Sequence, residues 1–104
     1  MIHNVFTIYD QKAEAYLPPF ILPKISMAKR TFSDCVNSKD HQFAAHPGDY
    51  TLFTIGTFDD ETAQYNVLLT PESLGLGLEY VINSPDLETS KADQNGAEIR
   101  QIEG

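Results

Sequence analysis

The strongest pattern of hydrophobic and polar positions in the chain lies at residues 50–58, where β-branched and aromatic residues dominate (YTLFTIGTF). A polar break at 59–62 (DDET) follows, and apolar and polar positions then alternate from Gln64 to Leu69. Residues of these types favour strands, and two strands that flank a short polar break are typical of a β-hairpin. We therefore predict a hairpin whose strands cover 50–58 and 64–69.

A second segment of the same kind, Val5–Tyr9, predicts the first strand, which Asp10 ends. The segment 16–23 that follows contains three prolines. Proline has no backbone donor and is therefore confined to the edges of sheets and to loops. We expect 16–23 to be an extended loop or an edge of the sheet.

One helix is predicted from about Met27 to Asn37. Ser26 is a good residue for a helix N-cap, and the apolar residues of this region share one helical stripe. The stripe consists of Ile25, Ala28, Phe32, Cys35 and Val36. The polar segment 38–49, with its Pro-Gly pair, is predicted to be a loop.

The segment after the hairpin is compatible with two structures. Thr70–Ser73 is typical of a helix start, with a threonine cap, a proline at the first position and an acid in the first turn. Gly75 and Gly77 disfavour a helix by roughly 1 kcal/mol each, so a strand at 78–82 is the alternative. Either way, the order strand–helix–strand–strand, closed by a short helix or strand, predicts an α+β domain.

With 104 residues and a mass of 11.6 kDa, the chain has room for one domain, which we place at residues 1–82. The apolar content falls from residue 83 onward, so we expect a flexible acidic tail at 83–104. A small core and the apolar, uncharged run at 50–58 favour a homo-oligomer built through exposed strand edges of the hairpin sheet.

The charges divide the chain into unlike halves. The net charge is −8, which disfavours a nucleic-acid partner, but residues 1–39 hold five lysines and arginines and only three acids. Three of these cations, Lys24, Lys29 and Arg30, surround the predicted helix start, where the helix dipole also attracts anions. The aromatic residues near them in sequence are Tyr9, Tyr16 and Phe20.

Cations beside aromatic side chains are what single-stranded nucleic acid requires for phosphate contact and base stacking. Three or four cations are few for holding phosphates, so the sequence favours the alternative of a solvated helix face with aromatic residues in the core. Candidate catalytic and metal sites are weaker. Cys35 lacks a polar setting that would activate it, and Cys35, His41 and His46 lack a fourth ligand and the spacing of a zinc site. We expect a binding protein that is not an enzyme and holds no cofactor or metal.

Several segments resemble a known family: VFTIYDQKAEAYLPPF at 5–20, AKRTFSDCVN at 28–37 and TPESLG at 70–75. Between the last two, the matching positions are Phe43, His46, Pro47, 49–53 and 56–60. Together they resemble the small nonstructural protein of gokushovirus-type microviruses, which are single-stranded DNA phages. The resemblance implies a DNA-binding phage protein that acts in the switch from genome replication to single-strand synthesis and packaging. We expect it in the host cytoplasm and away from membranes, because no apolar run approaches the ~20 residues that a membrane-spanning helix needs.

Two functions therefore follow as hypotheses. In the first, a non-enzymatic phage protein engages single-stranded DNA or phage or host replication proteins, through Lys24, Lys29, Arg30 and the nearby aromatic residues. In the second, the chain is an acidic protein–protein adaptor that binds a host factor or mimics DNA, with no direct DNA contact.

Deletion of residues 84–104 is expected to leave stability almost unchanged, because their composition cannot bury enough apolar area to offset the entropy of ordering. Thermal melting of the truncated chain checks this. A melting temperature lower by more than about 5 °C, which corresponds to a loss on the order of 1 kcal/mol, would show instead that this segment packs on the domain.

Overall fold

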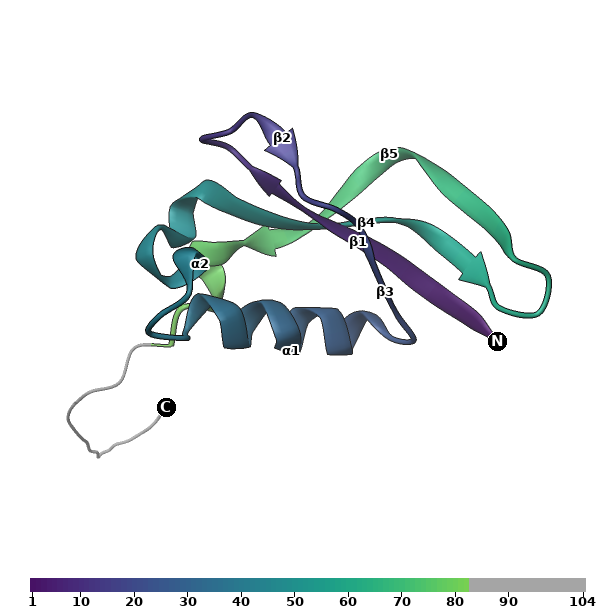
Figure 1. Cartoon of the computed structure of the whole chain (residues 1–104), viewed down its shortest axis with the longest axis horizontal. Helices are drawn as coiled ribbons and strands as arrows, with labels where there is room; N and C mark the ends of the chain where they lie inside the picture. The colour runs from purple at the N-terminus through teal and green to yellow at the C-terminus, as the bar shows by residue number, and fades with distance from the viewer. Residues whose placement is uncertain (83–104) are drawn as a thin grey trace.

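The computed structural model describes residues 1–82, which form one antiparallel sheet with helices on one of its faces (Figure 1). The strand order is β2-β1-β4-β5, and β3 pairs with β1 on the same edge as β2. The α+β class predicted from the sequence is confirmed. The elements are β1 (Ile2–Asp10), β2 (Ala15–Tyr16), β3 (Phe20–Leu22), α1 (Ile25–Val36), α2 (Gln42–Ala45), η1 (Pro47–Asp49), β4 (Tyr50–Asp59), β5 (Gln64–Leu76) and η2 (Gly77–Tyr80).

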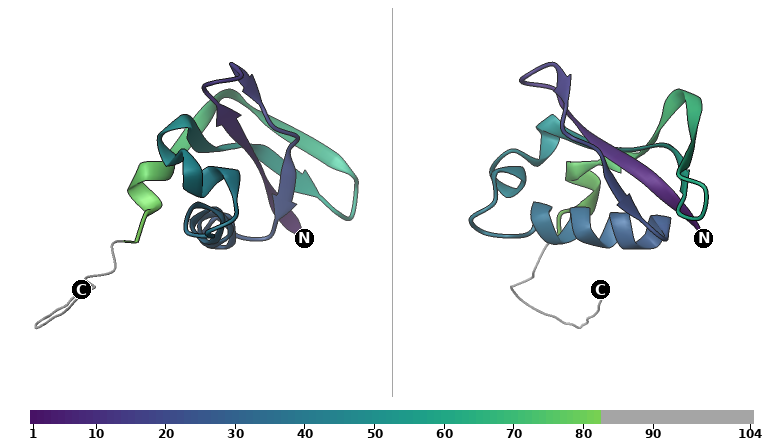
Figure 2. Two further views of the ribbon diagram at one scale, coloured as in Figure 1. Left: turned by 60° about the vertical axis from the view of Figure 1, so that its left-hand side comes forward. Right: turned by 45° about the vertical axis from the view of Figure 1, so that its right-hand side comes forward.

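The core lies between α1 and one face of the sheet. Because side chains alternate along a strand, β1 turns Phe6 and Ile8 toward α1, and β4 does the same with Leu52. Phe6, Leu52 and Phe32 of α1 are fully buried. The views in Figure 2 show that α1 and α2 lie on the same side of the sheet, and we call the opposite side the open face.

Strand β4 lies inside the sheet, with β1 on one side and β5 on the other. The apolar run at 50–58 is therefore paired on both sides, and the expectation that it contributes an exposed edge is wrong. The exposed edge of the hairpin is β5. The short strands β2 and β3 flank the prolines 18 and 19 at the other edge, as expected for that segment.

Helix α1 begins two residues earlier than an N-cap at Ser26 implied, at Ile25. Lys24 is the N-cap, with extended backbone angles, and its side chain makes no capping hydrogen bond. Ser26 instead lies in the first turn. The predicted loop at 38–49 contains α2 and η1, and the N–H of Phe43 donates to Nδ1 of His41 at 3.1 Å. This contact caps α2 and brings the Phe43 ring into the core.

A short helix closes the described fold, as the predicted order allowed, but no helix starts at Thr70 and no strand covers 78–82. Thr70–Ser73 continues β5, where Glu72 pairs with Thr54, and residues 77–80 form η2 instead of a strand. The sheet decides the outcome, because pairing with β4 outweighs the local helix signals. Gly75 has a φ of +129°, a conformation that side chains rarely adopt, and the hydroxyl of Tyr80 donates to the carbonyl of Leu74 at 2.7 Å. These features reverse the chain after β5.

The expected tail at 83–104 lies outside the described residues. None of the helices within residues 1–82 has the length and hydrophobicity that crossing a bilayer requires.

A β-carbon added at Gly56 would lie 2.3 Å from the carbonyl oxygen of Asn66, which belongs to the backbone of β5. We therefore expect Gly56→Ala to lower the free energy of unfolding by about 1–3 kcal/mol, as overpacking does. Urea denaturation measures the change. The matched control is Gly48→Ala, whose added carbon meets only the side chain of Leu78, at 3.3 Å, and which should stay within about 1 kcal/mol of the parent. Equal effects of the two substitutions would contradict the prediction.

Candidate binding groove

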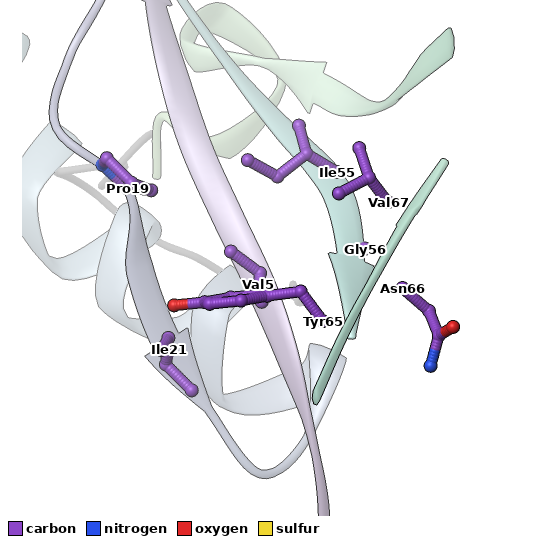
Figure 3. Close-up of a pocket in the computed structure, with 8 residues that line it drawn as sticks. All are labelled: Val5, Pro19, Ile21, Ile55, Gly56, Tyr65, Asn66 and Val67. Carbon is purple, nitrogen blue, oxygen red and sulfur yellow. The ribbon is translucent and has the colours of Figure 1, made fainter. Parts of the chain in front are cut away.

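The open face carries an apolar groove made of two adjoining hollows. The first, shown in Figure 3, has a volume of about 230 Å³ and is lined mainly by Val5, Pro19, Ile21, Ile55, Tyr65 and Val67. The second, of about 350 Å³, shares Pro19, Ile55 and Val67 with the first and adds Thr7, Tyr16, Leu17, Leu68 and Pro71. We call the two together the open-face groove.

The curl of the sheet produces the groove. Strands β1 and β4 form its floor, the segment from Tyr16 to Ile21 forms one wall, and β5 forms the other. In Figure 3 the Tyr65 ring extends from β5 across Val5 of β1 toward Ile21, so residues from opposite edges of the sheet meet over its centre.

An irregularity between β4 and β5 shapes the second wall. Gly56 pairs with Val67 and Thr54 pairs with Glu72, so the four residues 68–71 of β5 stand opposite the single residue Ile55. Extra residues in one strand bend it away from its partner. The resulting arch of β5 is visible in Figure 1, and it brings Leu68 and Pro71 to the groove.

Two hydrogen bonds hold the first wall. The hydroxyl of Thr7 donates to the carbonyl of Leu17 at 2.7 Å, and the N–H of Leu17 donates to the carbonyl of Ile8 at 2.8 Å. Thr7 is a buried polar residue on the open face, and this bond satisfies its donor. The wall is therefore fixed to β1 although it lies among prolines.

The groove is apolar and uncharged. No lysine, arginine, aspartate or glutamate is among the residues 1–82 that line its two hollows. Large apolar side chains remain exposed along the β5 wall, where Tyr65 is 56% and Val67 is 78% accessible. Contiguous exposed apolar surface of this kind marks an interaction site.

Aromatic side chains border both hollows. At the second hollow, the ring of Tyr16 lies 4.9 Å from that of Tyr9 and 5.8 Å from that of Phe53. At the first, the rings of Tyr65 and Phe58 are 4.9 Å apart. Rings in such arrangements stabilise one another and present large, rigid surfaces for binding.

The structure separates the six residues that the sequence suggested for nucleic-acid binding. Tyr9 and Tyr16 lie on the open face, whereas Phe20 packs on Phe6 with ring centres 5.6 Å apart, beside the core. The cations Lys24, Lys29 and Arg30 are exposed on α1, which covers the opposite face of the sheet. No ion pair within residues 1–82 involves these three cations.

Electrostatic contacts cluster at the tip of the β4–β5 hairpin instead. The Asp60 carboxylate lies 2.7 Å from the amino group of Met1 and 2.7 Å from Nε2 of His3. Hydrogen bonds from these two groups lower the pKa of Asp60. The hydrogen bond to Asp60 in turn raises the pKa of the Met1 amino group. The contacts fasten the start of β1 to the hairpin.

The only cysteine, Cys35, is half-buried on α1. Burial, and secondarily the charge of Asp34, raise the pKa of its thiol, so the reactive thiolate is disfavoured at neutral pH. Within residues 1–82 no three histidine, cysteine or carboxylate side chains gather as metal ligands would. Cys35 is therefore not an activated nucleophile.

Sequence reasoning missed the residues that line the groove, including Ile55, Tyr65, Val67 and Pro71. The sequence signals at these positions were the alternation of 64–69, which predicted a strand, and the prolines near residue 19, which predicted a loop or a sheet edge. Neither signal indicated a groove. The register jump opposite Ile55, which assembles these residues into two walls, leaves no motif in the sequence.

Comparison with known proteins identifies one family. Residues 3–80, which make up most of the chain, match the family model described as Phage ORF5 protein. No curated protein and no solved structure matches the chain.

Proposed function

Because the chain belongs to the Phage ORF5 protein family, we propose that it is a non-enzymatic phage protein that binds the replication complex through its open-face groove. In this role it contributes, in the host cytoplasm, to the switch from genome replication to single-strand synthesis and packaging. The observation that carries the proposal is the groove itself, an exposed apolar hollow bordered by aromatic side chains.

A protein ligand suits the groove better than DNA does. Phosphates are held chiefly by lysine and arginine, and neither lines the hollows in the described residues. The chain also carries a net charge of −8, which repels a polyanion. An extended apolar segment of a replication protein would instead bury the Tyr65 and Val67 side chains, and the net charge of −8 favours a partner with basic residues beside that segment.

Single-stranded DNA is the second candidate, and the exposed cations of α1 favour it. Lys24, Lys29 and Arg30 lie on the first half of the helix and make no ion pair within residues 1–82. Since Tyr9 and Tyr16 lie on the other face of the sheet, base stacking on them cannot accompany contact with these cations in one short strand. DNA binding at α1 is therefore expected to be weak and almost wholly electrostatic.

Substitution of Tyr16→Ser together with Tyr65→Ser should abolish binding to the phage replication proteins, because both exposed rings border the groove. The measurement is a pull-down from infected cells after nuclease treatment, with the replication proteins identified by mass spectrometry. Leu78→Ser with Ile82→Ser is the matched control, since both residues are exposed outside the groove, at 58% and 70%. Retention of the same replication proteins by the groove variant would contradict the proposal, provided circular dichroism shows an unchanged fold.

Charge reversal at Lys29→Glu and Arg30→Glu should eliminate any binding of single-stranded DNA without unfolding α1, because both side chains are exposed. Fluorescence anisotropy with a labelled oligonucleotide measures the effect. With about three phosphates neutralised, the slope of log affinity against log salt for the parent is expected to be near −2. If the parent does not bind at low salt, or if the reversed chain binds equally well, the cations of α1 do not bind DNA.

A further inference from the structure

Among residues 1–82, one of the two edges of strand β5 has no partner. It is the last strand in the sheet order and pairs with β4 alone. Of its 13 residues, the ten from Gln64 to Ser73 are exposed without interruption. The outer edge therefore presents backbone N–H and C=O groups that another strand can pair with, which folded proteins normally prevent.

The side chains of this edge are apolar. Tyr65, Val67 and Leu69 are 56%, 78% and 103% accessible, so Leu69 is not covered at all by the described chain. Leu69 does not line the open-face groove, and a ligand of the groove alone would leave it in water. A second covering surface is needed along β5.

The distribution of charge favours a second copy of the chain as the partner at this edge. The segment from Thr62 to Pro71 contains no charged residue, although the chain as a whole has a net charge of −8. Two copies of such an acidic protein repel each other over most of their surfaces, and an uncharged segment is where they can approach. The charged residues and prolines that protect edge strands in other proteins are absent from 62–70.

The opposite edge of the sheet does not compete for this role. Strands β2 and β3 have two and three residues, and prolines separate them. Edges that short, with missing donors, support little pairing. Within residues 1–82, β5 is thus the long edge available for extending the sheet.

We propose that two copies of this chain form a dimer by antiparallel pairing of β5 with β5 along residues 64–70. A two-fold axis across an antiparallel edge lets each strand satisfy the backbone groups of the other, and it joins the two sheets into one. The apolar side chains of Tyr65, Val67 and Leu69 are then covered by their counterparts. Since Tyr65 and Val67 also form a groove wall, the two grooves lie on either side of the axis.

This dimer goes beyond the proposed function and does not require the replication complex as a ligand. Purified chain suffices to test it, by sedimentation equilibrium over a range of concentrations. The expected mass is twice the 11.6 kDa of the chain. Val67→Lys with Leu69→Lys places four positive charges across the axis and should weaken dimerisation at least tenfold, giving the single-chain mass.

The matched control is Met27→Lys with Ile82→Lys, which adds the same charge at exposed apolar positions outside β5. This variant should keep the dimer. Hydrogen exchange adds a second readout. Those amides of 64–70 that do not bond to β4 should be protected in the parent and lose protection in the Val67/Leu69 variant, while those of α1 remain unchanged. A single-chain mass for the parent, a dimer that survives the lysines in β5, or a lack of protection at these outward-pointing amides would each overturn the proposal.

Discussion

Packing of α1 against a single face of the sheet is the contact on which the other features of the molecule depend. Phe32 of α1 meets Phe6 and Leu52 in the only extended core of the described residues. Removing one such aromatic side chain from a core typically costs about 3–5 kcal/mol, which is a large part of the stability of a small domain. Residues 1–82 contain one helix of this length, which covers one face of the sheet, and nothing else in this part of the chain covers the second face.

The exposed face is shaped by an imperfection in strand pairing. If β4 and β5 paired in regular register, β5 would lie flat beside β4 and the face would have no second wall. The extra residues opposite Ile55 turn β5 into an arch, and the absence of a side chain at Gly56 lets the two backbones approach where the arch begins. The groove thus exists because of the irregular pairing of β4 and β5. Bulges in strands often occur beside functional sites in this way.

The sequence predicted the parts of the fold that periodicity controls. The strand at 5–9, the helix near 27–37 and the hairpin all follow from the spacing of apolar residues, and the family resemblance to phage proteins agrees with the Phage ORF5 match. The segment 70–82 could not be predicted in this way. Thr70 and Pro71 carry genuine helix-start signals, but β5 is an edge strand and tolerates proline. The pairing of Glu72 and Ser73 with β4 therefore outweighs the local preference for a helix. The predicted nucleic-acid site is not assembled because closeness in sequence did not become closeness in space. Tyr16 and Lys24, for example, lie on opposite faces of the sheet once β3 and α1 have formed.

The pairing of β1 with β4 joins segments that lie far apart in the sequence, with Ile2 opposite Asp59 and Asp10 opposite Tyr50. During synthesis, β1 and α1 therefore emerge from the ribosome well before the strand that completes their core. Until residue 59 is available, Phe6 and Phe32 have no closed interior to enter, and loop closure over this distance must precede any gain from burial. The nascent chain consequently passes through a stage in which the apolar faces of β1 and α1 are exposed together, and the core closes only when β4 has been synthesised.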